Sequence, residues 1–279
     1  MNRAERRRQE RARKKGTSDT TQLEVEMIQP WADVLMRVKL PQMIIDAMLE
    51  ITDQVLQDPD RKNWGDNLAG QIADEPLIPH ELMANYKIGK EGNVYGFLMD
   101  IVGKYIQHCM FQSATSLDAD KIKGREWMTQ MKSCWIISQW ESEYNPIHIH
   151  TECQMSTVMY LKIPKFLPAV KPDRDDDGNI MFIGGAGVNS ALTRNLLKWK
   201  PKVGDFFIFP AHLQHTVYPF KTDGDFERRS VSFNADFIDK EVLEQKQKEQ
   251  EEMMKQQQQQ QAPQPIQQAP ETLTINTEA

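Results

Sequence analysis

The stretch of sequence that decides the fold is Asn145-Pro-Ile-His-Ile-His-Thr-Glu152. Successive side chains of a β-strand point to opposite faces of a sheet, so His148, His150 and Glu152 are predicted to share one face. Imidazole and carboxylate groups are common ligands of divalent transition metals. The stretch therefore predicts a strand that carries part of a mononuclear metal site.

A second histidine segment follows in Phe209-Pro-Ala-His-Leu-Gln-His215-Thr-Val217. The residues before it, 203–210, read as a turn glycine, a short apolar strand and a terminating proline. His215 is thus predicted to begin the next strand, from which it can complete the metal site. His212 is its nearest rival, and a buried His215 bonded to a backbone carbonyl is the structural alternative.

The spacing leaves the ligand set open. Three protein ligands are enough for an open iron site, and one strand end seldom presents three of them to a single ion. We favour His150 and His215, with Glu152 or His148 as the third. Free coordination positions indicate a catalytic site, and no catalytic residue is expected beyond the metal centre.

Strand and helix patterns surround these segments. β-Branched and aromatic residues bounded by turn formers predict strands at 134–140 and 155–164. Apolar residues at helical spacing predict helices at 40–56 and 95–109, with an alternating strand at 34–40 before the first. We expect the helices to brace the sheet that carries the site.

Alternation recurs in Arg228-Arg-Ser-Val-Ser-Phe-Asn234, where Arg228 and Ser230 share a polar face. Such a face is also ordinary for a surface strand. If this strand is the hairpin partner of the strand that begins at His215, Arg228 lies inside a barrel near the metal. A buried arginine is costly without an anion, and its planar fork fits a carboxylate. We therefore expect a ligand that carries a carboxylate.

These motifs together resemble a known family. The pair His150-x-Glu152, a distal His215 preceded by Gly-x5-Pro, and Arg228-x-Ser230 about a dozen residues later resemble the Fe(II)/2-oxoglutarate-dependent oxygenases. More narrowly, Asn-Pro-x-His-x-His followed by Ser156 and Tyr160-Leu, then Phe-Pro before the distal histidine and Arg-x-Ser-x-Ser-Phe-Asn, resemble the 2-oxoglutarate oxygenases of bacteria and tailed phages. The resemblance is close over residues 130–237 and looser upstream.

The resemblance implies a mainly β fold with flanking helices, a double-stranded β-helix of the jelly-roll or cupin-like kind. It implies Fe(II) and 2-oxoglutarate as cofactors, O2 as cosubstrate, and a dioxygenase that couples oxidative decarboxylation of 2-oxoglutarate to hydroxylation of a primary substrate. Arg228 would pair with the far carboxylate of 2-oxoglutarate. Ser230 would support that carboxylate, and Tyr160 would hydrogen-bond it.

One departure from the family pattern bears on the ligand set. His148 adds a third imidazole beside the expected His150-x-Glu152 pair. If Glu152 does not reach the metal, the site has three histidines, and the alternative is a cupin-like metal enzyme that does not use 2-oxoglutarate. A further alternative is a non-catalytic barrel used as a structural or interaction module. The primary substrate and the oligomeric state are left open.

The 279 residues divide into three predicted parts. Residues 1–20 form a basic arm, expected to be disordered, with binding to an acidic or phosphate-bearing partner as the functional alternative. Residues 21–238 form the oxygenase barrel with its N-terminal helical support. Residues 239–279 form a charged helix followed by a disordered tail rich in glutamine and proline.

Composition limits the remaining classes. The net charge of -6 conceals the basic arm, so the body is acidic and general nucleic-acid binding by it is not expected. Cys109, Cys134 and Cys153 lack Cys-x-x-Cys spacing, which fits a reducing cytoplasm, that of the host if a phage encodes the chain. No signal peptide or membrane span is predicted.

Overall fold

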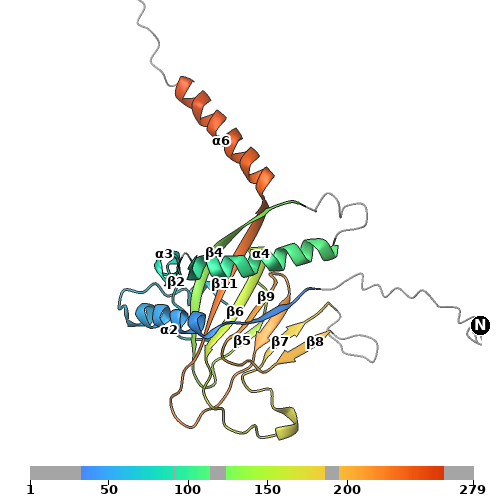
Figure 1. Cartoon of the computed structure of the whole chain (residues 1–279). Helices are drawn as coiled ribbons and strands as arrows, with labels where there is room; N and C mark the ends of the chain where they lie inside the picture. Colours follow the sequence, from blue (N-terminus) through green and yellow to red (C-terminus); the bar gives the residue numbers. More distant parts are fainter. Residues whose placement is uncertain (1–32, 91, 114–123, 186–194, 261–279) are drawn as a thin grey trace, which may run out of the picture. The chain divides into compact units, whose positions relative to one another are not determined.

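Two antiparallel sheets form the centre of the protein (Figure 1). The structure, a computed structural model, describes residues 33–90, 92–113, 124–185 and 195–260. The predicted arm at 1–20 and the end of the glutamine-rich tail, 261–279, lie outside these residues. The three-part division of the chain therefore stays a prediction.

The larger sheet has the strand order β1-β9-β6-β11-β4 and the smaller one β5-β10-β7-β8. The larger sheet consists of β1 (Met36–Lys39), β9 (Asp205–Pro210), β6 (Met155–Lys162), β11 (Arg228–Asp239) and β4 (Trp127–Gln139). The smaller sheet consists of β5 (Asn145–His148), β10 (Gln214–Val217), β7 (Ile180–Ile183) and β8 (Leu196–Trp199).

The path of the chain between the sheets identifies the fold. From β4 to β11 the chain crosses repeatedly from one sheet to the other, with β4, β6, β9 and β11 in the larger and β5, β7, β8 and β10 in the smaller. This alternation is the topology of a double-stranded β-helix, so the predicted fold class is confirmed. Apolar side chains of both sheets pack in the interior: Val158, Tyr160, Ile180, Phe182, Phe207, Phe209, Leu213 and Val217.

Strand β6 shows why the larger sheet is apolar on both faces. All of its residues but the last are buried. Val158 and Tyr160 face the barrel interior, whereas Met159 and Leu161 belong to the core on the other side. A strand covered on both faces reads as a continuous apolar run, which matches the sequence of this segment.

Helices cover the outer face of the larger sheet (Figure 1). These are α2 (Gln42–Gln57), α3 (His80–Asn85) and α4 (Val94–Ser113). The helices predicted at 40–56 and 95–109, and their bracing role, are confirmed. The short elements are η1 (Gly65–Asn67), β2 (Lys87–Ile88), β3 (Gly92–Asn93) and η2 (Pro172–Arg174), and α6 (Lys240–Gln260) follows β11.

None of the helices in the described part of the chain is long and apolar enough to cross a membrane.

One expectation about strand pairing is wrong. β11 is not the hairpin partner of β10, because β10 pairs with β5 and β7 while β11 pairs with β4 and β6. The connection between them crosses from one sheet to the other, as the double-stranded β-helix requires. Arg228 still lies inside the barrel, but it enters from the sheet opposite His215.

Candidate metal centre

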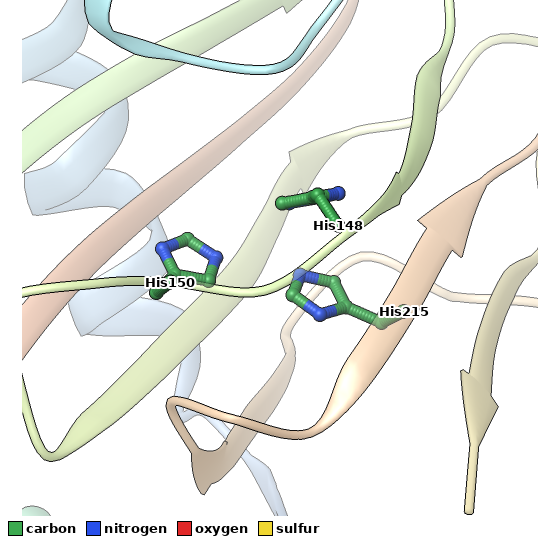
Figure 2. A group of neighbouring side chains, drawn as sticks. All are labelled: His148, His150 and His215. Atoms are coloured by element: carbon green, nitrogen blue, oxygen red, sulfur yellow. The ribbon is translucent and has the colours of Figure 1, made fainter.

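Three histidines converge inside the barrel (Figure 2). His148 ends β5, and His215 lies opposite it in register on β10. His150 follows the end of β5, and its backbone N–H donates to Ala211 O at 2.9 Å. One ligand atom from each histidine lies within 4.8 Å of those from the other two. Three imidazoles at this separation can share one metal ion.

Backbone carbonyls orient two of the three rings. The Nδ1 atom of His148 lies 2.8 Å from Pro146 O, and that of His215 lies 2.9 Å from Leu213 O. A carbonyl only accepts, so each Nδ1 carries the hydrogen and donates it. The Nε2 lone pair of each ring is then free for a metal. Such contacts to the second nitrogen are the usual support of metal-bound histidine.

All three imidazoles are neutral at pH 7. Burial lowers the pKa of His215 to about 3, with a smaller contribution from the neighbouring His148 and His150. Burial, and then His148, lowers the pKa of His150 to about 4. The pKa of His148 is also lowered, mainly by burial. Metal ions bind the unprotonated ring, so no proton has to leave before a metal enters.

Glu152 lies outside this cluster of histidines. Its side chain is exposed, and its backbone has a φ of 59°, in the left-handed region. The strand period that relates residues 148 and 150 therefore does not continue to 152. The backbone carbonyl of Glu152 accepts a hydrogen bond from Lys132. The structure brings His148, rather than Glu152, to His150 and His215.

His212, the rival of His215, points elsewhere. Its side chain is 72% exposed and pairs with Asp33 at 2.9 Å. It does not belong to the histidine cluster that the described residues form.

A cavity of about 1400 Å³ connects the histidines to the inner face of the larger sheet. Arg228, Ser230 and Tyr160 line it together with the three histidines. Ser230 and Tyr160 are direct neighbours across β11 and β6. The cavity therefore joins the candidate metal ligands to the three residues that the sequence predicts for a bound carboxylate.

Arg228 is buried without a counter-ion among the residues that the structure describes. It is 2% exposed, and it donates to Gly178 O at 2.8 Å and to the side-chain oxygen of Gln139. Its Nε has no hydrogen-bond partner. Burial lowers the pKa of Arg228 to about 10, so the guanidinium is charged at pH 7. A buried cation in this state lacks the anion that would offset its desolvation.

Tyr160 offers a second unsatisfied donor beside it. The guanidinium carbon of Arg228 lies 5.8 Å from the centre of the Tyr160 ring. The Tyr160 hydroxyl is buried and has no hydrogen-bond partner in the structure. Burial raises its pKa to about 12, so it keeps its proton. Together, the two side chains present N–H and O–H groups that an oxygen anion can accept from.

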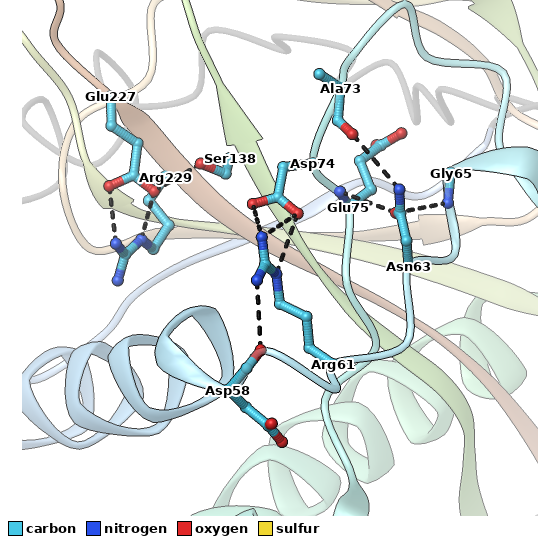
Figure 3. A network of polar contacts seen from close by, with 10 residues as sticks. All are labelled: Asp58, Arg61, Asn63, Gly65, Ala73, Asp74, Glu75, Ser138, Glu227 and Arg229. Carbon is cyan, nitrogen blue, oxygen red and sulfur yellow. Dashed lines mark hydrogen bonds and ion pairs between the residues drawn. The ribbon is translucent and has the colours of Figure 1, made fainter.

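The neighbouring Arg229 shows the opposite situation (Figure 3). Its guanidinium donates to both carboxylate oxygens of Glu227, at 2.7 and 2.8 Å, and also pairs with Asp53. Glu227 in turn accepts from the Ser138 hydroxyl at 3.0 Å. Arg229 is therefore satisfied by protein groups and needs no ligand. Of these two neighbouring arginines, Arg228 alone lacks a counter-ion among the described residues.

Two residues near the candidate site, a hydrogen-bond partner of Arg228 and a residue that lines the cavity, carry little signal in the linear sequence. Gln139 lies opposite Arg228 in the pairing of β4 with β11, and only the strand alternation places it there. Glu75 lines the cavity from a loop with no strand or helix pattern. The sequence around Gln139 or Glu75 does not predict a site, because the residues that each one meets in the fold are distant in the chain.

Comparison with known proteins gives a family similarity for one segment of the chain. Residues 133–234 match the family model described as "Putative 2OG-Fe(II) oxygenase". No curated protein is similar enough in sequence to match the chain. The matched segment contains the three histidines, Tyr160, Arg228 and Ser230.

Several solved structures are loosely similar. A prolyl-4-hydroxylase from Pseudomonas putida is 13% identical, with 72% of this chain and 91% of that chain covered and a TM-score of 0.39. A prolyl hydroxylase from Trichoplax adhaerens is 11% identical, with 72% and 82% covered and a TM-score of 0.41. A non-heme alpha-ketoglutarate-dependent epimerase from nogalamycin biosynthesis is 13% identical, with 73% and 78% covered and a TM-score of 0.41.

TM-scores at this level give no argument about function, so the fold assignment rests on the strand topology described above. The family match lies on the strands that carry the histidines and the buried arginine. Residues 133–234, which contain the histidine cluster and Arg228, are therefore similar to the 2OG-Fe(II) oxygenase family.

Proposed function

We propose that the chain is an Fe(II)/2-oxoglutarate-dependent dioxygenase that hydroxylates a primary substrate. His148, His150 and His215 would hold the iron, and Arg228, Ser230 and Tyr160 would hold 2-oxoglutarate. The bound iron and 2-oxoglutarate supply the oxidation chemistry. The observation that carries the proposal is a buried, unpaired Arg228 in the same cavity as the three-histidine cluster.

The residues present fit a dicarboxylate with a keto acid. One carboxylate can accept from the free Nε–H of Arg228 and from the Tyr160 hydroxyl, the two donors without partners. Neutral imidazoles with free Nε2 atoms suit a divalent iron. The chain itself would orient 2-oxoglutarate, keep the histidines neutral and exclude water from the interior of the barrel. Burial strengthens each of these polar contacts.

A second candidate is a cupin-like metal enzyme that does not use 2-oxoglutarate. The observation that favours it is the composition of the cluster, which contains three histidines and no carboxylate among the described residues. In that enzyme, Arg228 would bind a carboxylate of the substrate itself. The two candidates differ in one product, because only the first forms succinate.

The test is an anaerobic titration of the purified protein with Fe(II) and 2-oxoglutarate. A visible charge-transfer band is expected, because a keto acid that chelates iron absorbs there. His215→Ala should abolish the band, whereas Arg228→Lys should weaken it by lowering the affinity for 2-oxoglutarate. His212→Ala is the matched control, since this exposed histidine lies close in sequence but outside the cluster.

Each result decides between the candidates. A band with these responses, followed by succinate formation in air, supports the oxygenase. Iron binding without a band favours the second candidate. Absence of iron binding in the wild type rules out both enzymes and leaves a non-catalytic barrel.

A further inference from the structure

Glu75 belongs to a segment that extends the larger sheet beyond β4. Ser138 N–H donates to Asp74 O at 3.1 Å, and Ile136 N–H donates to Pro76 O at 2.9 Å. These contacts place Glu75 opposite Ile137, one of the β4 residues that line the cavity. The Glu75 side chain therefore lies on the inner face, in the same cavity as the histidine cluster and Arg228.

The carboxyl group of Glu75 is buried and incompletely satisfied. The residue is 1% exposed, and its Oε2 atom has no hydrogen-bond partner. Within the described residues, no basic group pairs with it. Its contact with Asn63 in Figure 3 is made by the Glu75 backbone N–H, at 3.3 Å. Buried polar groups are nearly always bonded, so this oxygen is available to a ligand.

The backbone leaves room around this carboxyl group. A Cβ atom on Gly70 would lie 2.6 Å from Asn145 Oδ1 and 3.2 Å from Glu75 Oε2. Only glycine at residue 70 allows these two side chains to stay where they are. Asn145 also lines the cavity, so two side-chain oxygens, from Glu75 and Asn145, gather at one corner.

The charges near this corner favour a positive ligand. Burial, and then the negative charge of Glu143, raises the pKa of Glu75 to about 8. The basic residues of the adjoining loop are engaged elsewhere. Arg61 pairs with Asp74 at 3.2 Å, and the Lys62 ammonium lies 5.3 Å from the centre of the Trp64 ring. With this pKa, Glu75 keeps its proton in most molecules at pH 7, so a cation from outside the chain would pair with the carboxylate that forms when the proton leaves, without displacing Arg61 or Lys62.

We propose that Glu75 and Asn145 form a substrate subsite for a positively charged nitrogen group, an ammonium or a guanidinium. The subsite rests on the proposed function for its role, because it would hold the primary substrate in the cavity that contains the metal. Arg228 and Glu75 would then bind groups of opposite charge in the same cavity. The arginine takes the carboxylate of 2-oxoglutarate, and the glutamate takes the cation of the substrate.

The test compares charged probes with neutral probes of the same shape. The probes are Nα-acetyl-arginine amide against Nα-acetyl-citrulline amide, and Nα-acetyl-lysine amide against Nα-acetyl-norleucine amide. Their dissociation constants are measured by calorimetry on the Fe(II)- and 2-oxoglutarate-loaded protein without oxygen. At least one charged probe should bind about tenfold or more tightly than its neutral counterpart, which equals about 1.4 kcal/mol.

Two variants assign the preference to a residue. Glu75→Gln keeps the shape of the side chain and should reduce the preference to about onefold. Glu81→Gln is the matched control, because Glu81 also lines the cavity but is exposed on α3. It should keep the preference. In wild type at pH 7, binding of the cation should also release a proton from Glu75, seen as a heat that depends on the buffer.

Three results would overturn the subsite: equal binding of charged and neutral probes, no binding of any probe, or a preference that survives in Glu75→Gln. A loss of Fe(II) affinity in Glu75→Gln would also overturn it, since Glu75 would then serve the metal. Failure of the proposed function is seen separately, as a missing charge-transfer band in wild type. Repeating the probe titration on metal-free protein shows whether the subsite binds the cation even if the proposed oxygenase function fails.

Discussion

The two faces of the larger sheet are both buried but differ in chemistry. On β11, Val231 and Phe233 point outward into the core beneath the helices, and both are 0% exposed. Arg228, Ser230 and Ser232 point inward and are also buried. The outer face packs apolar side chains against the helices, and its buried Arg229 is paired with protein carboxylates. The inner face is polar although it is hidden from solvent.

The unsatisfied polar atoms in the described part of the chain show what this difference means. Buried side-chain atoms without a hydrogen-bond partner occur in Glu75, Ser156, Tyr160, Asn179, Arg228 and Asn234. All those on β6 and β11 occupy inner-facing positions. A packing surface does not accumulate such atoms, because each costs about 1–3 kcal/mol. The inner face is therefore arranged for ligands rather than for stability.

The largest expected effect is on the outer face. Phe233→Ala should destabilise the protein by about 3–5 kcal/mol, because it leaves a cavity in a close-packed core. Ser232→Ala, on the neighbouring inner position, should change the free energy of unfolding by less than about 1 kcal/mol. Urea unfolding of the metal-free protein measures both. Similar costs for the two substitutions would contradict the distinction between the faces.

The next effect tests whether His148 or Glu152 is the third metal ligand on the inner side of the barrel. His148→Ala should weaken Fe(II) binding by about 100-fold or more, because it removes one of the three proposed ligands. Loss of a residue that only hydrogen-bonds a metal ligand typically costs about 10–100-fold. Glu152→Ala should leave the affinity within about threefold, since Glu152 is exposed and outside the cluster. Anaerobic competition against a coloured chelator measures both. The reverse order would restore the histidine-and-carboxylate site.

The histidine cluster also predicts how stability depends on pH. Unfolded histidine has a pKa of about 6.5, whereas the pKa of His215 is about 3 and that of His150 about 4 in the folded protein. Below about pH 6.5, His150 and His215 bind protons in the unfolded state but stay unprotonated in the folded state, so the unfolded state is favoured. Metal-free protein should therefore lose stability as the pH falls from about 6.5 toward 4.

Urea unfolding at pH 7, 6 and 5 checks this dependence. His215→Asn should show a shallower loss of stability, because it removes one of the groups that protonate only after unfolding. A wild-type stability that stays constant over this range, or an unchanged slope in the variant, would refute the expectation.

The smallest expected effect concerns Arg228 without ligand. Arg228→Met removes a buried charge that has no counter-ion, at the expense of the contacts with Gly178 and Gln139. Since replacing a buried charge by an apolar side chain is often neutral or stabilising, stability should change by less than about 1 kcal/mol. If 2-oxoglutarate binds as proposed, it should raise the melting temperature of the Fe(II)-loaded wild type, and this rise should disappear in Arg228→Met. A large loss of stability would show that Arg228 holds the fold.

Much of the barrel and part of the site could be predicted from local patterns. Periodicity predicts the helices at 40–56 and 95–109 and the strand that begins near His215. In each element, apolar residues recur at the spacing that places them on the face that packs against the core. The partners of β10 and β11, which lie in different sheets, could not be predicted, since a hairpin and a crossover between sheets use strands of the same pattern. The same limit applies to Glu75, whose loop reaches β4 through backbone contacts alone.

The sequence by itself determined the residue types of the site and the alternation that places them on strands. His148 and His150 share a face because a strand has a period of two, and Arg228 and Ser230 share one for the same reason. Only the tertiary structure decided which of these groups meet. β5 ends at His148, and Glu152 beyond it has a left-handed backbone that keeps its side chain outside the cluster. Register sets His215 against His148, because long-range packing rather than local spacing chooses the partners.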